Sequence, residues 1–362
     1  METMFQYICE TPDQCRDNIY HSKELTQKVV DLFCERDYKR IMILSSGSSY
    51  HAALTPKYFV EKILKVKVEV MTSFTALHYE RVFDEDTFYI GMGQSGRSNN
   101  TNQAMQMLRD AGCKVVGVTG NVESVMKNHC DLIVNWGMGI EKIGFVTKGF
   151  STGVLFYMLF ALEAALKKQK MTEAEYASYK DELLKMCDVI ERAIPVVNAW
   201  YERNADGLYD FNRAQVLGVG PGFGAALEGA LKMQETMGKA CTAFEAEEFL
   251  HGPCYEINGD KTLFILDTGG QNKERILKLY HEVHRLTENV YLITNTPVDD
   301  SKACIVEHDL SEDMAVLINI ISMQIVAANG HAKWVNPMLE KRVAFTEAMD
   351  TKSAKTGKEI GL

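Results

Sequence analysis

The chain has 362 residues, of which 46% are hydrophobic and 24% charged, and it carries a formal net charge of −10 at pH 7. This length accommodates two domains of ordinary size, and the composition is that of a soluble globular protein. The negative charge argues against nucleic acid or an anionic membrane surface as a partner, although backbone N–H groups and hydroxyls can still bind a small phosphate.

The sequence carries no visible targeting or cofactor signal. Residues 1–14 lack a basic stretch followed by an apolar one, which predicts no signal peptide. The longest apolar run, residues 154–166, is too short to span a bilayer and is expected to form a buried helix. The nine cysteines are scattered singly, and the pair His281 and His284 is expected on an exposed helix face. The sequence therefore predicts a cytoplasmic protein without a metal ion or another cofactor.

Apolar runs alternate with helical patterns along the chain, which is typical of βαβ units and a parallel sheet. The predicted strands of the first half begin, in chain order, at Arg40, Val68, Phe88, Val115 and Leu132. Those of the second half begin at Val216, Cys241, Leu263, Val290 and Ile305. The sequence thus predicts an α/β fold of two tandem lobes, each a mainly parallel five-stranded sheet flanked by helices.

The two halves match each other at a nearly constant offset. The Ala-Ala-Leu run at residues 52–54 recurs at residues 225–227, an offset of 173, and Thr119 matches Thr294 at an offset of 175. A sustained offset indicates a duplicated fold. We therefore expect an N-terminal helical segment (1–35), a first lobe (36–185), a helical linker (186–211), a second lobe (212–340) and a polar tail (341–362).

Two loops of the first lobe have the composition of a phosphate site. Residues 45–50 (Ser-Ser-Gly-Ser-Ser-Tyr) and 93–98 (Gly-Gln-Ser-Gly-Arg-Ser) each follow a predicted strand and precede a helix. Ligands bind at the carboxyl ends of parallel strands, where glycines admit an anion and serines donate hydrogen bonds. Ordinary helix N-caps would also explain the serines. The equivalent loops of the second lobe, 220–224 and 268–270, have lost this pattern, so we expect the phosphate site in the first lobe.

A predicted helix of the second lobe carries charges inside an apolar pattern. Glu228, Lys232 and Glu235 lie within one narrow stripe of that helix, and solvated ion pairs are the usual explanation of such a stripe. His251 precedes Gly-Pro, which places it outside a regular helix. From the residues alone, a catalytic role and an ordinary surface role stay open for both segments.

The serine-rich loops resemble the two phosphosugar-binding loops of the sugar isomerase (SIS) domain family. The tandem arrangement, over about residues 36–362, resembles the isomerase half of glucosamine-6-phosphate synthase. The resemblance implies that the sugar phosphate contacts Gly47, Ser48, Ser49, Gln94, Ser95 and Ser98. Gly93 stands where the family usually has serine. Residues 141–151 resemble the loop over the sugar, but Val146 replaces a serine, so only backbone contacts are implied there.

Residues 226–253, Ala-Leu-Glu-Gly-Ala-Leu-Lys through Glu-Phe-Leu-His-Gly-Pro, are similar to the catalytic segment of the synthase, with the same Glu-to-His spacing. This resemblance implies that Glu235 moves a proton between C1 and C2 of the sugar. It implies that His251 opens the sugar ring or acts as an acid, that Lys232 supports the site, and that Glu228 helps to bind substrate.

The resemblance also implies an assembly and a role for the tail. In the family the histidine belongs to the neighbouring subunit, which implies a homodimer or a higher homo-oligomer. A lysine of the C-terminal tail closes over the sugar in the synthase, and Lys355 is the best positional match, followed by Lys352. The polar composition of this tail is otherwise typical of disordered tails.

The SIS-like region begins within about forty residues of Met1, so we expect no glutaminase domain and no glutamine-dependent amide transfer. The chain is then similar to deglycases of fructosamine 6-phosphates, such as those of fructoselysine or glucoselysine type. That similarity implies hydrolysis of a phosphorylated sugar–amine conjugate to a hexose 6-phosphate and an amino acid. One alternative is a deaminating aldose/ketose isomerase of glucosamine or galactosamine 6-phosphate. An alternative of another class is a non-catalytic regulator that senses sugar phosphates.

Overall fold

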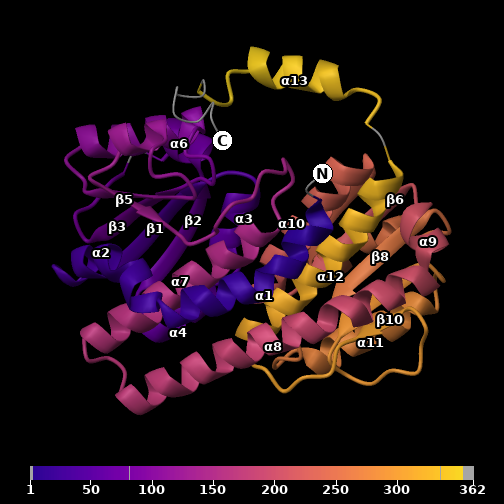
Figure 1. Cartoon of the computed structure of the whole chain (residues 1–362). Coiled ribbons are helices and arrows are strands. Elements are labelled where there is room, and N and C mark those ends of the chain that lie inside the picture. The colour runs from indigo at the N-terminus through magenta and orange to yellow at the C-terminus, as the bar shows by residue number, and fades with distance from the viewer. Residues whose placement is uncertain (1–2, 81, 335, 354–362) are drawn as a thin grey trace. The chain divides into compact units, whose positions relative to one another are not determined.

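The computed structural model describes residues 3–80, 82–334 and 336–353, and within them it confirms the predicted α/β fold. Two five-stranded sheets, in which every strand pair is parallel, are flanked by helices (Figure 1). The chain divides into two compact units. The N-terminal unit comprises Gln14–Glu141, Gly149–Tyr179 and Pro337–Leu362. The C-terminal unit comprises Met1–Asp13, Lys142–Lys148 and Lys180–Asn336.

The sheet of the N-terminal unit has the strand order β2-β1-β3-β4-β5. Its strands are β1 (Arg40–Ser45), β2 (Lys67–Thr72), β3 (Thr87–Met92), β4 (Val115–Thr119) and β5 (Leu132–Asn135). The helices that precede, connect or follow them are α1 (Met4–Tyr20), α2 (Ser22–Cys34), α3 (Ser48–Leu54), α4 (Lys57–Leu64), α5 (Ser73–His78), α6 (Asn99–Asp110), the 3₁₀ turn η1 (Val125–Asn128) and α7 (Lys148–Lys167).

Side chains alternate between the two faces of this sheet, as the pleat requires. Tyr89 of β3 packs in a core cluster with α6, and its neighbour Phe88 points to the other face. There, the Phe33 ring of α2 lies 5.2 Å from the ring of Phe88 and 5.3 Å from that of Phe160 in α7. Helices α2 and α7 therefore cover one face and α6 the other.

The sheet of the C-terminal unit has the order β10-β9-β8-β6-β7. Its strands are β6 (Arg213–Gly218), β7 (Ala240–Glu245), β8 (Lys261–Leu266), β9 (Val290–Thr294) and β10 (Ala303–Ile305). Its helices are α10 (Pro221–Met237), α11 (Lys273–His284) and α12 (Glu312–Lys333), with 3₁₀ turns η2 (Glu248–His251) and η3 (Pro253–Glu256). Helix α10 packs on β6, β7 and α12. The remaining helices of the described residues are α8 (Glu173–Arg203), α9 (Ala205–Tyr209) and α13 (Leu339–Ala348).

The order of strands and helices confirms the duplication. Strands β6 and β7 repeat β1 and β2 at the same offset of 173 residues, and both sheets reverse their strand order at the same point. One difference has a local cause. The pair α3 and α4 is interrupted near Pro56, because proline lacks the N–H that a continuous helix needs, whereas the corresponding α10 runs unbroken.

Within the described part of the chain, two helices are apolar and long enough to cross a membrane, and both are core helices. Helix α7 has a mean hydropathy of 1.6 and α12 one of 1.4 over the best window, yet 89% of each window is buried inside the protein. Residues 154–166 thus belong to a buried helix, as predicted, but that helix is 20 residues long and length alone would not have excluded a span. Helices α7 and α12 are therefore apolar in the way of core helices, which are hydrophobic on all sides.

Candidate functional site

The two serine-rich loops are neighbours at the carboxyl edge of the N-terminal sheet. Strands β1 and β3 pair directly, and the strand order reverses between them, which is the point where open α/β sheets bind ligands. The buried Ser45 hydroxyl donates to the Met92 carbonyl at 2.9 Å and ties the two strand ends together. The loops at residues 46–49 and 93–98 therefore start side by side.

The first loop turns into α3 through Gly47, whose φ of 58° is a left-handed conformation that suits glycine. Ser48 and Ser49 open the helix and are half-buried, so both side chains remain accessible.

The second loop is held by hydrogen bonds that sequence reasoning did not find. The Gln94 carbonyl accepts from the N–H of Gly120 at 3.0 Å and from the Thr119 hydroxyl at 3.1 Å. The Asn102 amide donates to the Gly96 carbonyl at 3.2 Å. A signal for Thr119 existed in the repeat: its counterpart, Thr294, donates at 2.7 Å to Asp267 in the C-terminal unit. Both threonines position the loop after the third strand of their sheet.

Ser98 is the N-cap of α6, which agrees with the alternative that the serines of these loops are ordinary helix N-caps. Its oxygen accepts from the Thr101 hydroxyl at 3.0 Å and from the Thr101 N–H at 3.5 Å. Thr101 in turn lies 2.8 Å from the buried Ser73 hydroxyl. Because the Ser98 oxygen acts as an acceptor in both bonds, its own hydrogen is left to donate to an anion.

Gly96 gives a direct test of the second loop. Its φ is +63°, and a Cβ there would lie 1.9 Å from the Ser124 hydroxyl oxygen. We expect Gly96→Ala to displace the loop and weaken sugar-phosphate binding by about tenfold or more, since several hydrogen bonds depend on the loop geometry. Gly259→Ala is the matched control, because nothing lies within 4 Å of its added Cβ. Calorimetric titration with a hexose 6-phosphate measures the affinity of both variants. Equal affinities would contradict the assignment of this loop to the phosphate site.

Up to residue 353, the C-terminal segment is ordered and lies along this second loop, unlike the disordered tail that its polar composition is typical of. Lys352 forms an antiparallel bridge with Ser98, and the Ser353 N–H donates to the Arg97 carbonyl at 2.9 Å. The Arg97 guanidinium donates back to the Ser353 carbonyl at 2.8 Å. Lys352 thus lies beside the second serine-rich loop. Lys355, the preferred match from the sequence, lies outside the described residues.

Two of the three charged side chains in the stripe of α10 are buried, so an ordinary solvated stripe, one of the two roles that the spacing left open, is not what the structure has. The side chains of Glu228 and Lys232 are 0% and 1% exposed, whereas that of Glu235 is 34% exposed. The Lys232 Nζ lies 3.4 Å from Glu228 Oε1 and donates to Glu235 Oε2 at 2.6 Å. The buried ammonium of Lys232 therefore holds Glu235, the one of the two carboxylates that reaches solvent.

The charge of Lys232 is stabilised by its two neighbours. Burial alone would lower its pKa, but the ion pairs with Glu228 and Glu235 outweigh burial, and the pKa of Lys232 is raised above its usual value. Lys232 consequently stays an ammonium at neutral pH, where it orients Glu235 and cannot itself act as a base.

His251 ends the 3₁₀ turn η2 and is exposed, in agreement with its expected place outside a regular helix. Hydrogen bonds from Arg275 hold the pKa of Glu247 below its usual range, and the charge of His251 contributes to this. Among the described residues, no hydrogen bond or ion pair joins His251 to Glu235. Within one chain, the two predicted catalytic residues of the C-terminal unit are therefore not in direct polar contact with each other.

The segment predicted to cover the sugar is anchored at its end. The Thr147 carbonyl accepts from the Gln324 amide at 3.1 Å, and the buried Lys148 pairs with Glu10 at 2.7 Å. Sequence reasoning missed the Glu10–Lys148 pair, because 138 residues separate the two.

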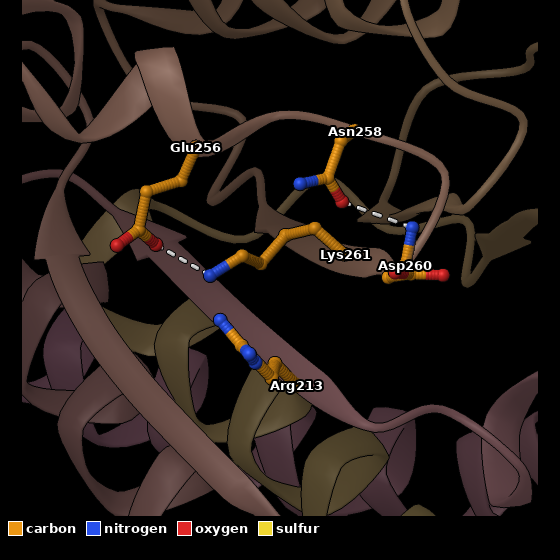
Figure 2. Close-up of a pocket in the computed structure, with 5 residues that line it drawn as sticks. All are labelled: Arg213, Glu256, Asn258, Asp260 and Lys261. Atoms are coloured by element: carbon orange, nitrogen blue, oxygen red, sulfur yellow. Dashed lines mark hydrogen bonds and ion pairs between the residues drawn. The ribbon is translucent and has the colours of Figure 1, made fainter.

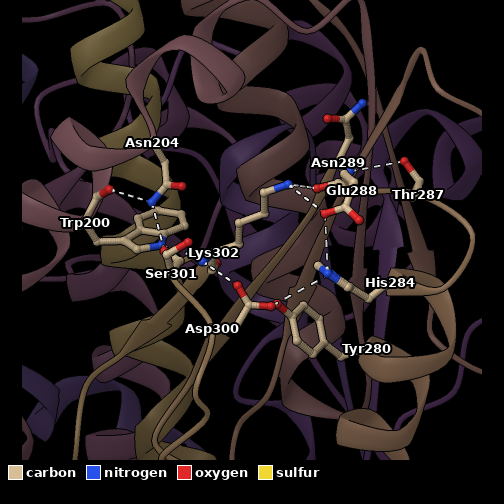
Figure 3. Close-up of polar contacts among 10 residues, drawn as sticks. All are labelled: Trp200, Asn204, Tyr280, His284, Thr287, Glu288, Asn289, Asp300, Ser301 and Lys302. Carbon is tan, nitrogen blue, oxygen red and sulfur yellow. Dashed lines mark hydrogen bonds and ion pairs between the residues drawn. The ribbon is translucent and has the colours of Figure 1, made fainter.

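Two other polar clusters of the C-terminal unit lie outside the predicted site. A cavity of about 140 Å³ opens where β6 and β8 begin, the end opposite to the ligand-binding edge, and there Lys261 pairs with Glu256 (Figure 2). His284 is half-buried, 3.5 Å from Glu288 Oε2 and 3.8 Å from Asp300 Oδ2 (Figure 3). The expectation of an exposed histidine pair is therefore wrong for His284.

The duplicated fold and the serine-rich loops indicate the class of protein. The SIS domain model matches residues 36–163 and again residues 207–327. The chain therefore belongs to the SIS domain family and contains the domain twice in tandem.

The curated relatives are longer proteins. The glutamine–fructose-6-phosphate aminotransferase (isomerizing) of Clostridium tetani is 29% identical over 267 residues, which cover 74% of this chain and 42% of that protein. Its namesake from Bacteroides thetaiotaomicron is 25% identical over 339 residues, covering 90% of this chain and 54% of that protein. The chain thus spans about half the length of these relatives.

Solved structures show the same tandem fold. A Clostridium difficile 630 protein, provisionally described as a phosphosugar isomerase, has a TM-score of 0.85 at 28% identity, with 95% of this chain and 98% of that chain covered. The C-terminal domain of glucosamine-fructose-6-phosphate aminotransferase from Francisella tularensis has a TM-score of 0.82 at 22% identity, with 91% and 95% covered. This chain therefore resembles the isomerase domain of these aminotransferases.

Proposed function

We propose that this protein is a deglycase that hydrolyses a fructosamine 6-phosphate type of conjugate to a hexose 6-phosphate and a free amino acid. The observation that carries the proposal is the arrangement on α10, where the buried Lys232 holds the partly exposed carboxylate of Glu235 at 2.6 Å. A carboxylate that is fixed in place and open to solvent suits proton transfer at carbon.

In the proposed reaction, Glu235 removes a proton from C1 of the ketosamine while the C2 carbonyl oxygen gains one, which gives an enaminol. Return of a proton to C2, with loss of the proton on nitrogen, moves the double bond and gives a C1 imine. Water then adds to C1 and the amine leaves. His251 opens a cyclic substrate or donates the proton to oxygen, a role that suits an imidazole, which can both donate and accept a proton.

The phosphate of the substrate is assigned to the serine-rich loops of the N-terminal unit. Ser48, Ser49, Ser95 and Ser98 supply hydroxyl donors, and Gln94 is fixed by its backbone. Neutral hydroxyl and backbone N–H donors can bind a dianion even in a chain with a negative net charge, and Lys352, which bridges to Ser98, adds a cation beside the loop.

A substrate screen tests the reaction. Sugar 6-phosphates that carry different amines are incubated with the protein, and the release of hexose 6-phosphate is measured together with the amine. Release of an amino acid supports the deglycase. Turnover of glucosamine or galactosamine 6-phosphate with release of ammonia would instead identify a deaminating isomerase. Tight binding without turnover of any conjugate would identify a sensor.

We also propose a homodimer in which His251 serves the neighbouring subunit. In one chain His251 is exposed, and Tyr255 of the following turn is 93% exposed, as residues that contact a partner would be before assembly. Mixing inactive Glu235→Ala and His251→Ala proteins under subunit exchange should therefore restore part of the activity, because one site of each mixed dimer is intact. No recovery despite proven exchange would show that each chain builds its own site.

A further inference from the structure

The N-terminal unit contains a cavity whose lining includes no residue of either serine-rich loop. Its volume is about 570 Å³, within the range of about 300–1,000 Å³ of small-molecule sites. Three helices line it, each with residues three or four positions apart and hence on one face. The lining residues are Lys23, Thr26, Gln27, Val30 and Asp31 of α2, Glu163, Leu166 and Lys167 of α7, and Glu173 and Tyr176 of α8.

The cavity has an apolar floor and a charged rim. Thr26, Val30 and Glu163 are buried, and Leu166 and Tyr176 are half-buried beside them. The rim residues are exposed, and they are Lys23, Gln27, Asp31, Lys167 and Glu173. A ligand that enters would therefore pass the charged rim and then contact apolar side chains, the residues Thr26 and Tyr176, and one carboxylate, that of Glu163.

Glu163 is that carboxylate, and only 9% of the residue is exposed. Its Oε1 accepts from the Ser22 hydroxyl at 2.6 Å and from the Tyr176 hydroxyl at 2.5 Å. Burial, followed by the hydrogen bond to Glu163, raises the pKa of Tyr176 to about 12, so this hydroxyl remains a donor at neutral pH. The second oxygen, Oε2, has no hydrogen-bond or ion-pair partner within the described part of the chain.

The cations at the rim do not neutralise this carboxylate. Lys167 lies one turn after Glu163, but its ammonium pairs with Asp31 at the exposed edge. No ion pair joins Lys23 to Glu163 among the described residues. Glu163 lines the cavity, and its Oε2 is not one of the fully buried oxygen atoms without a partner, so this oxygen is accessible from the cavity. It offers a charged acceptor there, and the floor is therefore complementary to a small positively charged group.

We propose that this cavity binds a small organic ammonium ion, a primary amine on a short apolar chain. The ammonium donates to Glu163 Oε2, and the carbon chain packs on Val30 and Leu166. This site is separate from the proposed catalysis, and it depends on neither Glu235 nor the phosphate loops.

Calorimetric titration with hexylammonium tests the proposal, with 1-hexanol and hexanoate as matched neutral and anionic probes. We expect one saturable site for hexylammonium and at least about tenfold weaker binding of the other two, because a hydrogen bond to a charged group contributes more than a neutral one. The Glu235→Gln protein should bind hexylammonium equally well. Absence of saturable binding, or equal affinity for hexanol, overturns the proposal.

Variants assign the binding to the cavity. Glu163→Gln keeps an acceptor for Ser22 and Tyr176 but removes the charge, so hexylammonium should bind about tenfold more weakly or worse. Glu173→Gln, which removes a carboxylate from the rim, should change affinity by less than about twofold. Val30→Trp should fill the floor and abolish binding. Unchanged binding of hexylammonium in Glu163→Gln overturns the proposal. Self-association of the protein that depends on Glu163 and is not affected by hexylammonium also overturns it, because the cavity would then be occupied by a second copy of the chain.

Discussion

The Glu235→Gln variant is expected to lose about 10²–10⁴-fold in turnover while it still binds the sugar phosphate. A primary amide accepts no proton near neutral pH, so the transfer between C1 and C2 would stop. The amide can still accept the hydrogen bond from Lys232, which lies 2.6 Å from the carboxylate, so the helix should keep its local structure. Initial rates of hexose 6-phosphate release measure turnover, and calorimetry with the same conjugate measures binding.

Glu274→Gln is a suitable control for this variant, because Glu274 is an exposed carboxylate in the first turn of α11. It should keep full turnover. In heavy water, the wild-type product should carry deuterium at C2 whenever the transferred proton exchanges before its return. Turnover within about threefold of wild type in Glu235→Gln would rule out general base catalysis by this residue.

The architecture was predictable because the same pattern of strands and helices occurs twice in the sequence. Ten short apolar runs alternate with helical patterns, and the offset near 173 residues fixed the correspondence of strands such as β1 and β6. That the serine-rich loops bind phosphate stays a prediction, but their place at one edge of the sheet was predictable, since the carboxyl ends of all strands of a parallel sheet lie at one edge. Their contacts with Thr119 and Asn102 were not, because these depend on how the loop folds back on β4 and α6.

Burial of the charged stripe could not be deduced from spacing alone. Positions 228, 232 and 235 share one face of α10, but only the packing of α10 against β6, β7 and α12 decides that this face is covered. The same limit applies to the tail and to the Glu10–Lys148 pair. Each depends on residues more than 130 positions apart in the sequence, which local pattern does not connect.

Lys232→Met should destabilise the C-terminal unit strongly. Lys232 faces Glu228, whose side chain is 0% exposed, so the substitution leaves a buried carboxylate without its cation. Removal of one partner from a buried ion pair costs about 3–5 kcal/mol. Methionine fills most of the space of the lysine stem, so the loss arises mainly from charge. Urea unfolding at pH 7 measures the change in the free energy of unfolding.

A second substitution separates the stability of this stripe from its role in catalysis. Adding Glu228→Gln to Lys232→Met removes the stranded charge, so the double variant should recover most of the lost stability, and the two effects should be strongly non-additive. Turnover should not recover with it, because Glu235 has still lost the ammonium that holds it at 2.6 Å. If turnover returned together with stability, Lys232 would serve the fold alone and the positioning of Glu235 would have to come from elsewhere. If the single variant were as stable as wild type, the buried ion pair would be contradicted.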